Sequence, residues 1–208
     1  MKKLLSMVLC AMMALTLAGC GGSSDDSSTY TYSSELDIKN LDSSDADDQC
    51  SIRTIHAVID GLMKTDKKGN ITYGIAKSEE VSDDGLTYTI TLKKGVKFSD
   101  GSDLTTEDVK YTFERMFTPA TGCTNTYMYN MITGAQDMLD GKATELSGFE
   151  TVDDYTFKLH INYKFAPFVA NLGMDYASIY PSDACAAAGE NWGKGTNLIG
   201  TGPYVIKE

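Results

Sequence analysis

The sequence predicts a mixed α/β (α+β) fold. Apolar residues alternate with Thr or other polar residues through 86–92 and 155–161, as in half-buried strands. In 52–62 and 109–117 they recur at helical spacing. The 208 residues are 42% hydrophobic and 23% charged, an ordinary globular composition. A chain of this length can bury a core without a disulfide framework, so we expect one large domain or two small ones.

The first twenty residues predict export and an anchor. A basic start, Met1 to Lys3, precedes an apolar run that is too short to span a membrane and ends in Leu17-Ala18-Gly19-Cys20. This segment resembles a bacterial lipoprotein signal. It implies a signal peptide over 1–19, lipid (palmitate) attachment at Cys20, and a position outside the cytoplasmic membrane. The alternative is an ordinary secretory signal with an incidental cysteine.

Residues 20–35 are expected to form a lipid-anchored flexible tether. Gly21 to Ser28 contains only Gly, Ser and Asp, which cannot pack a core. Three further cysteines remain beyond Cys20, at positions 50, 123 and 185. Their spacing matches no zinc-binding pattern, and we expect them to be structural or incidental.

The elements follow in order. Thr/Tyr alternation predicts a strand over 29–38, and a stripe of Ile52, Ile55, Ile59 and Leu62 predicts a helix from Asp47. The acidic segment before this helix, Ser44 to Asp48, can supply its N-cap and favours the positive end of the helix dipole. Further strands are expected over 71–75, 86–92 and 96–98, and a hairpin over 149–161. Further helices are expected over 105–117, where Thr105 is the cap, and over 133–141, 165–172 and 182–189. A turn at 200–203 precedes a last apolar run, 204–206.

Charge and motifs favour binding over catalysis. The net charge of −11 argues against nucleic acid and against adsorption to anionic lipid. No nucleophile elbow, metal motif or phosphate loop is present, and His56 and His160 read as structural or solvated. The paired Asp residues read as turns and caps. We therefore predict a protein that is not an enzyme, with no catalytic residue, metal or cofactor.

Five short sequence motifs, in their order along the chain, resemble those of the extracellular solute-binding proteins of family 5. These are the peptide-, dipeptide- and nickel-binding lipoproteins of ABC importers. The motifs are Ile59-Asp60-Gly61-Leu62, Lys77 to Tyr88, Gly95 to Gly101, Leu104 to Val109 and Gly200 to Tyr204. The sequence departs from the family pattern at Ser43, Glu79 and Ser99, where Pro, Trp and His are usual.

The resemblance implies a type II periplasmic-binding-protein-like fold. The chain would supply lobe one, with residues 36–54 and 176–208 as an incomplete core and 55–175 as an inserted subdomain. Family members are well over twice this length, and the last pattern stops after three residues. We therefore expect the chain to be the N-terminal part of a longer protein whose second lobe closes on the ligand by a hinge.

The implied function is capture of oligopeptides or dipeptides outside the cytoplasmic membrane and their delivery to an ABC permease with its ATPase subunits. One alternative is a nickel chelate, haem or a sugar oligomer as ligand. A second is a surface lipoprotein for signalling or adhesion, and a third is an extracellular hydrolase, which no triad or metal set supports.

The resemblance also implies which residues line the cleft. These are Ser44, Asp45, Asp47 and Asp48 after the first strand, the aromatic pair Tyr127 and Tyr129, and Phe165. Tyr rings offer broad contact with a hydroxyl donor, and an Asp attracts a cationic ligand group. For the Asp residues the alternative is helix capping; for the Tyr residues it is packing in the subdomain core.

Overall fold

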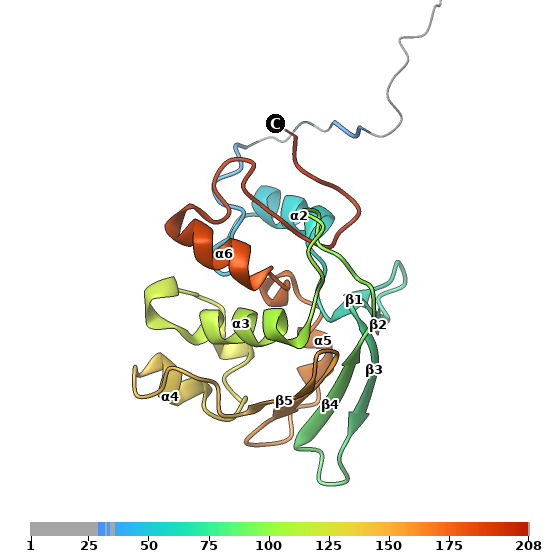
Figure 1. Ribbon diagram of the computed structural model, residues 1–208, viewed down its shortest axis with the longest axis vertical. Helices are drawn as coiled ribbons and strands as arrows, with labels where there is room; N and C mark the ends of the chain where they lie inside the picture. Colours follow the sequence, from blue (N-terminus) through green and yellow to red (C-terminus); the bar gives the residue numbers. More distant parts are fainter. Residues whose placement is uncertain (1–28, 32, 34–35, 208) are drawn as a thin grey trace, which may run out of the picture. The chain divides into compact units, whose positions relative to one another are not determined.

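A computed structural model describes residues 29–31, 33 and 36–207 of the chain (Figure 1). The predicted signal peptide, Cys20 and most of the predicted tether lie outside the described residues. Leu36–Glu208 is one compact unit, distinct from Met1–Glu35. In the described part of the chain, no helix is both long and apolar enough to cross a membrane.

A four-stranded antiparallel sheet forms the centre of this unit, in the order β3-β4-β6-β5. Its strands are β3 (Ala76–Val81), β4 (Thr87–Leu92), β5 (Phe149–Asp153) and β6 (Thr156–His160). In β4 and β6, buried residues alternate with half-buried ones, as the period-two pattern predicts. Ile90 and Phe157 face each other across the β4–β6 pair on the buried side.

Helix α3 (Thr106–Phe117) covers the buried side of the sheet through Val109, Phe113, Met116 and Phe117. The helix begins at Thr105 because of a complete capping box, in which Thr105 accepts from the N–H of Glu107 and Asp108 accepts from the N–H of Thr105. Figure 1 places α6 (Ser182–Ala188) alongside α3. Asp108 also joins the two helices, since it accepts from the N–H and hydroxyl of Ser182.

Smaller elements complete the unit. A two-stranded sheet pairs β1 (Met63–Thr65) with β2 (Ile71–Tyr73). The short helices are α4 (Ala135–Leu139) and α5 (Phe168–Asn171), with single turns η1 (Pro119–Thr121), η2 (Thr126–Met128), η3 (Asp175–Ala177) and η4 (Gly189–Asn191). Helix α2 (Gln49–Val58) precedes them all in the chain.

Apolar side chains gather in two clusters. The larger runs from Leu62 to Ile179 and fills the space between the sheet, α3 and α5. The smaller joins Leu41 to Ile59 with Tyr180 to Leu198, so that it contains α2 and α6. The boundary between the clusters falls near residues 60 and 180, where Ile179 donates its N–H to the carbonyl of Asp60.

The mixed α/β class is confirmed, and several predicted elements differ in detail. The described residues of 29–38 contain no strand, and neither 96–98 nor 204–206 forms one; Lys97 makes only an isolated bridge to Asp103. The predicted helices 133–141 and 165–172 shrink to α4 and α5. Helix α2 ends at Val58, because Ile59 adopts an extended backbone. Ile59 and Leu62 are buried as predicted, but they belong to the segment after the helix and not to the helix itself.

Candidate functional site

A buried polar network fixes the segment that precedes α2. Arg115, in the last turn of α3, donates to both carboxylate oxygens of Asp42 and to the hydroxyl of Ser44 at 3.0 Å. Tyr180 donates to Asp42 at 3.2 Å, and its hydroxyl also pairs with that of Ser43. The Arg115 guanidinium lies over the Tyr180 ring, 5.5 Å from its centroid.

The charges in this network stabilise one another. Burial opposes the charged form of Arg115, yet the hydrogen bond and negative charge of Asp42 raise the pKa of Arg115 above its ordinary value. Burial raises the pKa of Tyr180, so its hydroxyl stays protonated and able to donate. Segment 41–46 is therefore held in one conformation by a partner on α3.

The predicted site residues at the start of α2 divide into two groups. Ser44 is buried within the network, and Asp48 is the N-cap of α2, accepting from the N–H groups of Cys50 and Ser51 at 2.9 Å each. Asp45 and Asp47 are exposed, and Asp45 accepts from Asn40. Asp48 thus has the capping role, whereas Asp45 and Asp47 present their carboxylates to solvent.

The predicted aromatic residues divide in the same way. Tyr127, in η2, is 66% exposed, whereas Tyr129 is fully buried and donates its hydroxyl to the carbonyl of Asn171 at 2.8 Å. Phe165 is half-buried against the larger cluster. Tyr129 therefore packs in the core, and Tyr127 is the one of the pair that offers a ring to the surface.

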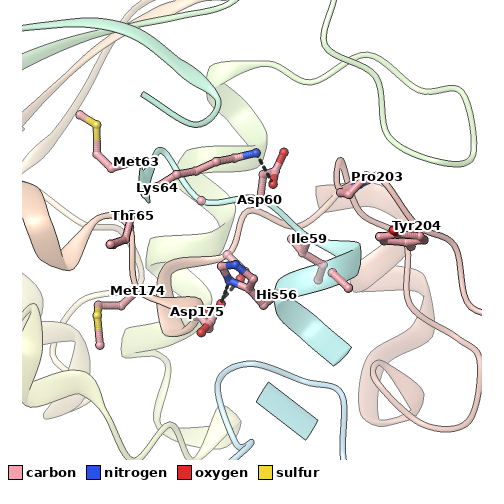
Figure 2. Close-up of a pocket in the computed structure, with 14 residues that line it drawn as sticks. His56, Ile59, Asp60, Met63, Lys64, Thr65, Met174, Asp175, Pro203 and Tyr204 are labelled. Atoms are coloured by element: carbon pink, nitrogen blue, oxygen red, sulfur yellow. Dashed lines mark hydrogen bonds and ion pairs between the residues drawn. The ribbon is translucent and has the colours of Figure 1, made fainter. Parts of the chain in front are cut away.

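A pocket opens at the other end of α2 (Figure 2). Two ion pairs flank it: Lys64 with Asp60 at 2.8 Å, and His56 Nδ1 with Asp175 Oδ1 at 2.8 Å. Apolar walls complete it, with Met174 on one side and Pro203 and Tyr204 on the other. His56, Lys64 and Asp175 were not predicted as site residues. His56 and Asp175 are 119 residues apart in the sequence, and Lys64 pairs with Asp60 in a segment without a recognisable binding motif.

Two observations connect the pocket with the network. The segment that leads to Tyr127 starts at the end of α3, three residues after Arg115 of the network, since Thr118 donates its N–H to the Arg115 carbonyl. The Asn171 amide donates to the carbonyl of Met128 at the end of that segment, and Gly173 to Asp175, which follow Asn171 in the chain, line the pocket. Helix α2, ten residues and therefore about 15 Å long, spans the same interval. The candidate site is thus a strip along α2, from Asp45 to Asp175.

The strip offers contacts rather than reaction chemistry. Its exposed groups are carboxylates, a lysine, a histidine and apolar side chains, which can orient and hold a polar ligand. Within residues 29–31, 33 and 36–207, no three His, Cys, Asp or Glu side chains come together as a metal site requires.

Comparison with known sequences identifies one family. The profile described as bacterial extracellular solute-binding proteins, family 5 (middle region), matches residues 70–208. A dipeptide-binding protein of Lactococcus lactis is 31% identical over 95% of this chain and 36% of its own length. Heme-binding protein A of Haemophilus influenzae is 37% identical over 67% of this chain and 27% of its own length. The chain thus spans about a third of the length of these relatives.

A solved structure agrees with the sequence matches. OppA of Listeria monocytogenes, bound to peptide, superposes with a TM-score of 0.78 and 28% sequence identity. The superposition covers 81% of this chain and 34% of the OppA chain. The type II binding-protein fold that the resemblance implied is therefore confirmed for the part that this chain contains.

Proposed function

Because this chain belongs to the bacterial extracellular solute-binding proteins of family 5, we propose that it captures peptides by reversible binding. The family consists of solute-binding proteins and not enzymes, so the protein works by holding its ligand without covalent chemistry. The observation that carries the proposal is the 31% identity, over 95% of this chain, to a dipeptide-binding protein. The likeness to a peptide-bound OppA agrees with it.

The strip along α2 is the proposed ligand surface on this chain. An extended peptide rises about 3.3 Å per residue, so four or five residues span the roughly 15 Å length of α2. Asp45, Asp47, Tyr127 and Phe165 would contact the ligand. Ser44, Asp48 and Tyr129 would support the surface without touching the ligand. Asp48 and Tyr129 each hold a backbone segment in place, and the Ser44 hydroxyl accepts from the Arg115 side chain.

The two apolar clusters support the proposed division into a lobe-one core and an inserted subdomain. The smaller cluster joins residues on both sides of the insert, Leu41 and Ala46 before it and Tyr180 to Leu198 after it, as an interrupted core requires. It also contains Ile55, Val58 and Ile59 from the first residues of the insert. The larger cluster falls almost wholly inside the insert. Arg115 would then tie the subdomain to the core through Asp42.

Anchoring and delivery complete the proposal. The lipoprotein signal resemblance and Cys20 support attachment to the outer face of the cytoplasmic membrane, where two acyl chains hold a protein stably. There the protein would hand its peptide to an ABC permease, whose ATPase subunits supply the energy.

Calorimetry of the complete mature protein tests peptide capture. Titration with tetra-alanine is expected to release or absorb heat with saturable binding. Asp45→Asn with Asp47→Asn should weaken binding several-fold, and Asp83→Asn, in an exposed turn of the distant β3–β4 hairpin, should leave the affinity unchanged. Absence of peptide binding by the unaltered protein would contradict the proposal.

Haem is the second candidate ligand, favoured by the 37% identity to heme-binding protein A. Titration with haemin distinguishes the two, because a bound porphyrin shifts its main absorption band. A saturable shift that tetra-alanine does not reverse, together with no peptide heat, would assign haem in place of peptide.

A further inference from the structure

The pocket at the end of α2 holds its negative charges deeper than its positive ones. The side chain of Asp60 is 19% exposed against 44% for Lys64, and that of Asp175 is 27% exposed against 70% for His56. In both pairs the carboxylate is less exposed than its basic partner, and Asp60 and Asp175 are therefore called the floor carboxylates. With His56 neutral, the charged side chains among the lining residues sum to one negative charge.

The backbones of Asp60 and Asp175 are both fixed by hydrogen bonds. The carbonyl of Asp60 accepts from Ile179 at 3.1 Å, and its N–H donates to the Thr201 hydroxyl at 3.3 Å. Asp175 opens η3, and its carbonyl accepts from the N–H and the hydroxyl of the buried Ser178. Lys64 instead reaches Asp60 through a long flexible side chain, which can swing into solvent at low cost because exposed ion pairs contribute at most about 1 kcal/mol.

The size and walls of the pocket suit one extended side chain. Its volume of about 320 Å³ lies at the lower end of ligand pockets, roughly 300–1,000 Å³, so it is too small for a whole peptide. Met174, Pro203 and Tyr204 offer apolar surface to an aliphatic stem, while Asp60 and Asp175 offer carboxylates to its tip. Lys and Arg have this combination of an apolar stem and a charged end.

We propose that this pocket accepts a basic side chain, Lys or Arg, of the bound peptide, whose cation replaces Lys64 or His56 as the partner of the floor carboxylates. Lys64 and His56 then act as resident substitutes that keep Asp60 and Asp175 paired while the pocket is empty. The inference rests on the proposed peptide binding and adds a side-chain preference to it.

Calorimetry of the complete mature protein with a lysine scan tests the preference. Four alanine tetrapeptides carry one Lys at successive positions, and each is compared with the same peptide carrying ε-acetyl-lysine. At one position Lys should bind about two- to fivefold tighter than acetyl-lysine, as expected for one partly exposed charge pair. Asp60→Asn with Asp175→Asn should abolish that preference, so that the lysine and acetyl-lysine peptides bind this variant with affinities within about twofold of each other.

Lys64→Met is expected to strengthen binding of the lysine peptide, in contrast to the Asn substitutions. It removes the internal competitor for Asp60, so the lysine peptide should bind about two- to fivefold tighter. Lys158→Met, which breaks a pair with Glu150 on the distant sheet, is the matched control and should change neither affinity.

Two results would overturn the inference: equal affinity for lysine and acetyl-lysine at all four positions, or a lysine preference that survives in the double Asn variant. Failure of every peptide to bind the unaltered protein would instead overturn peptide capture itself, and this inference with it.

Discussion

Arg115 and Asp42, which are 73 residues apart in the sequence, form a bidentate ion pair with N–O distances of 3.1 and 2.5 Å. Both side chains are largely buried, at 16% and 11% exposure. The pair joins the end of α3 to the segment that leads into α2. The exposed Asp45 and Asp47 follow directly, so their positions depend on a residue of the neighbouring helix.

Arg115→Met should therefore destabilise the protein by about 3–5 kcal/mol, because it leaves the Asp42 carboxylate buried without its counter-charge. Urea unfolding measures the loss. Adding Asp42→Leu removes the uncompensated charge, so the double variant should be more stable than Arg115→Met alone. If the two single losses simply add in the double variant, the pair is not energetically coupled.

The same variant also reports on the site. Ser44 donates its N–H to Asp42 at 3.0 Å, and Ala46 donates its N–H to the Asp42 carbonyl at 2.9 Å. Without Arg115 these amides should exchange with solvent faster than those of β4. Asp108→Asn serves as the control, because it weakens the α3–α6 contact without touching this segment.

Local patterns predicted the elements whose signals are complete within a few residues. Thr105 with Asp108 marks the start of α3, and strict alternation marks β4 and β6. Strand β3 was missed, because Lys77, Glu79 and Glu80 give it no alternation, and as an edge strand it tolerates charge. Only the neighbouring β4 defines it.

The candidate site was less predictable, since its contacts are long-range. Nothing near Arg115 indicates that its partner lies 73 residues away. Tyr127 and Tyr129 are two residues apart in an irregular segment, where no period separates inward from outward positions. The capping role of Asp48, by contrast, could be predicted from the sequence as an alternative, because a cap is a local interaction.

Protonation of Asp48 is expected to make the free energy of unfolding depend on pH in the acidic range. Hydrogen bonds from the hydroxyl and N–H of Ser51 lower its pKa below the ordinary 3.8. The folded state therefore holds this proton less tightly than the unfolded state, so the stabilisation is complete above pH 3.8 and is lost as the pH falls through the folded value.

Asp48→Asn should accordingly lower stability at pH 7, and its deficit should shrink below pH 3.8. Thermal unfolding between pH 2 and 7 measures the deficit, and Asp83→Asn controls for the loss of one surface charge. A deficit that stays constant over this range would contradict the capping carboxylate as its source.

Gly202 explains physically why the turn at 200–203 contains glycine. Its N–H donates to the Val58 carbonyl at 2.8 Å, and a Cβ at this position would lie 2.6 Å from the Val58 carbonyl carbon and 2.7 Å from the Ala57 oxygen. The turn thus packs its backbone directly against the end of α2, next to the pocket.

Gly202→Ala should cost about 3 kcal/mol, because backbone atoms cannot move aside as a flexible side chain can. Gly141→Ala is the comparison, since its Cβ would meet nothing within 4 Å and only its φ of 69° opposes the change, at about 1–2 kcal/mol. If denaturant unfolding showed equal losses of stability for the two variants, the close approach of Gly202 to α2 would not contribute to stability.

Cys20→Ser tests the proposed anchor. The variant should move from the membrane fraction to the soluble extracytoplasmic fraction and lose incorporation of labelled palmitate. Cys50→Ser, which leaves the signal untouched, should remain with the membrane. Membrane association of Cys20→Ser equal to that of the unaltered protein would rule out lipid at this cysteine as the anchor.

Tyr127 and Tyr129 offer the sharpest separation of binding from folding. Tyr127→Ala changes a side chain that is 66% exposed, so stability should stay within about 0.5 kcal/mol while peptide affinity falls several-fold. Tyr129→Phe removes only the hydrogen bond to Asn171, so it should cost about 1 kcal/mol of stability and leave the affinity unchanged. Tyr163→Ala, at another exposed tyrosine, measures the nonspecific effect of losing a surface ring. If Tyr127→Ala affects affinity no more than Tyr163→Ala does, η2 does not line the ligand surface.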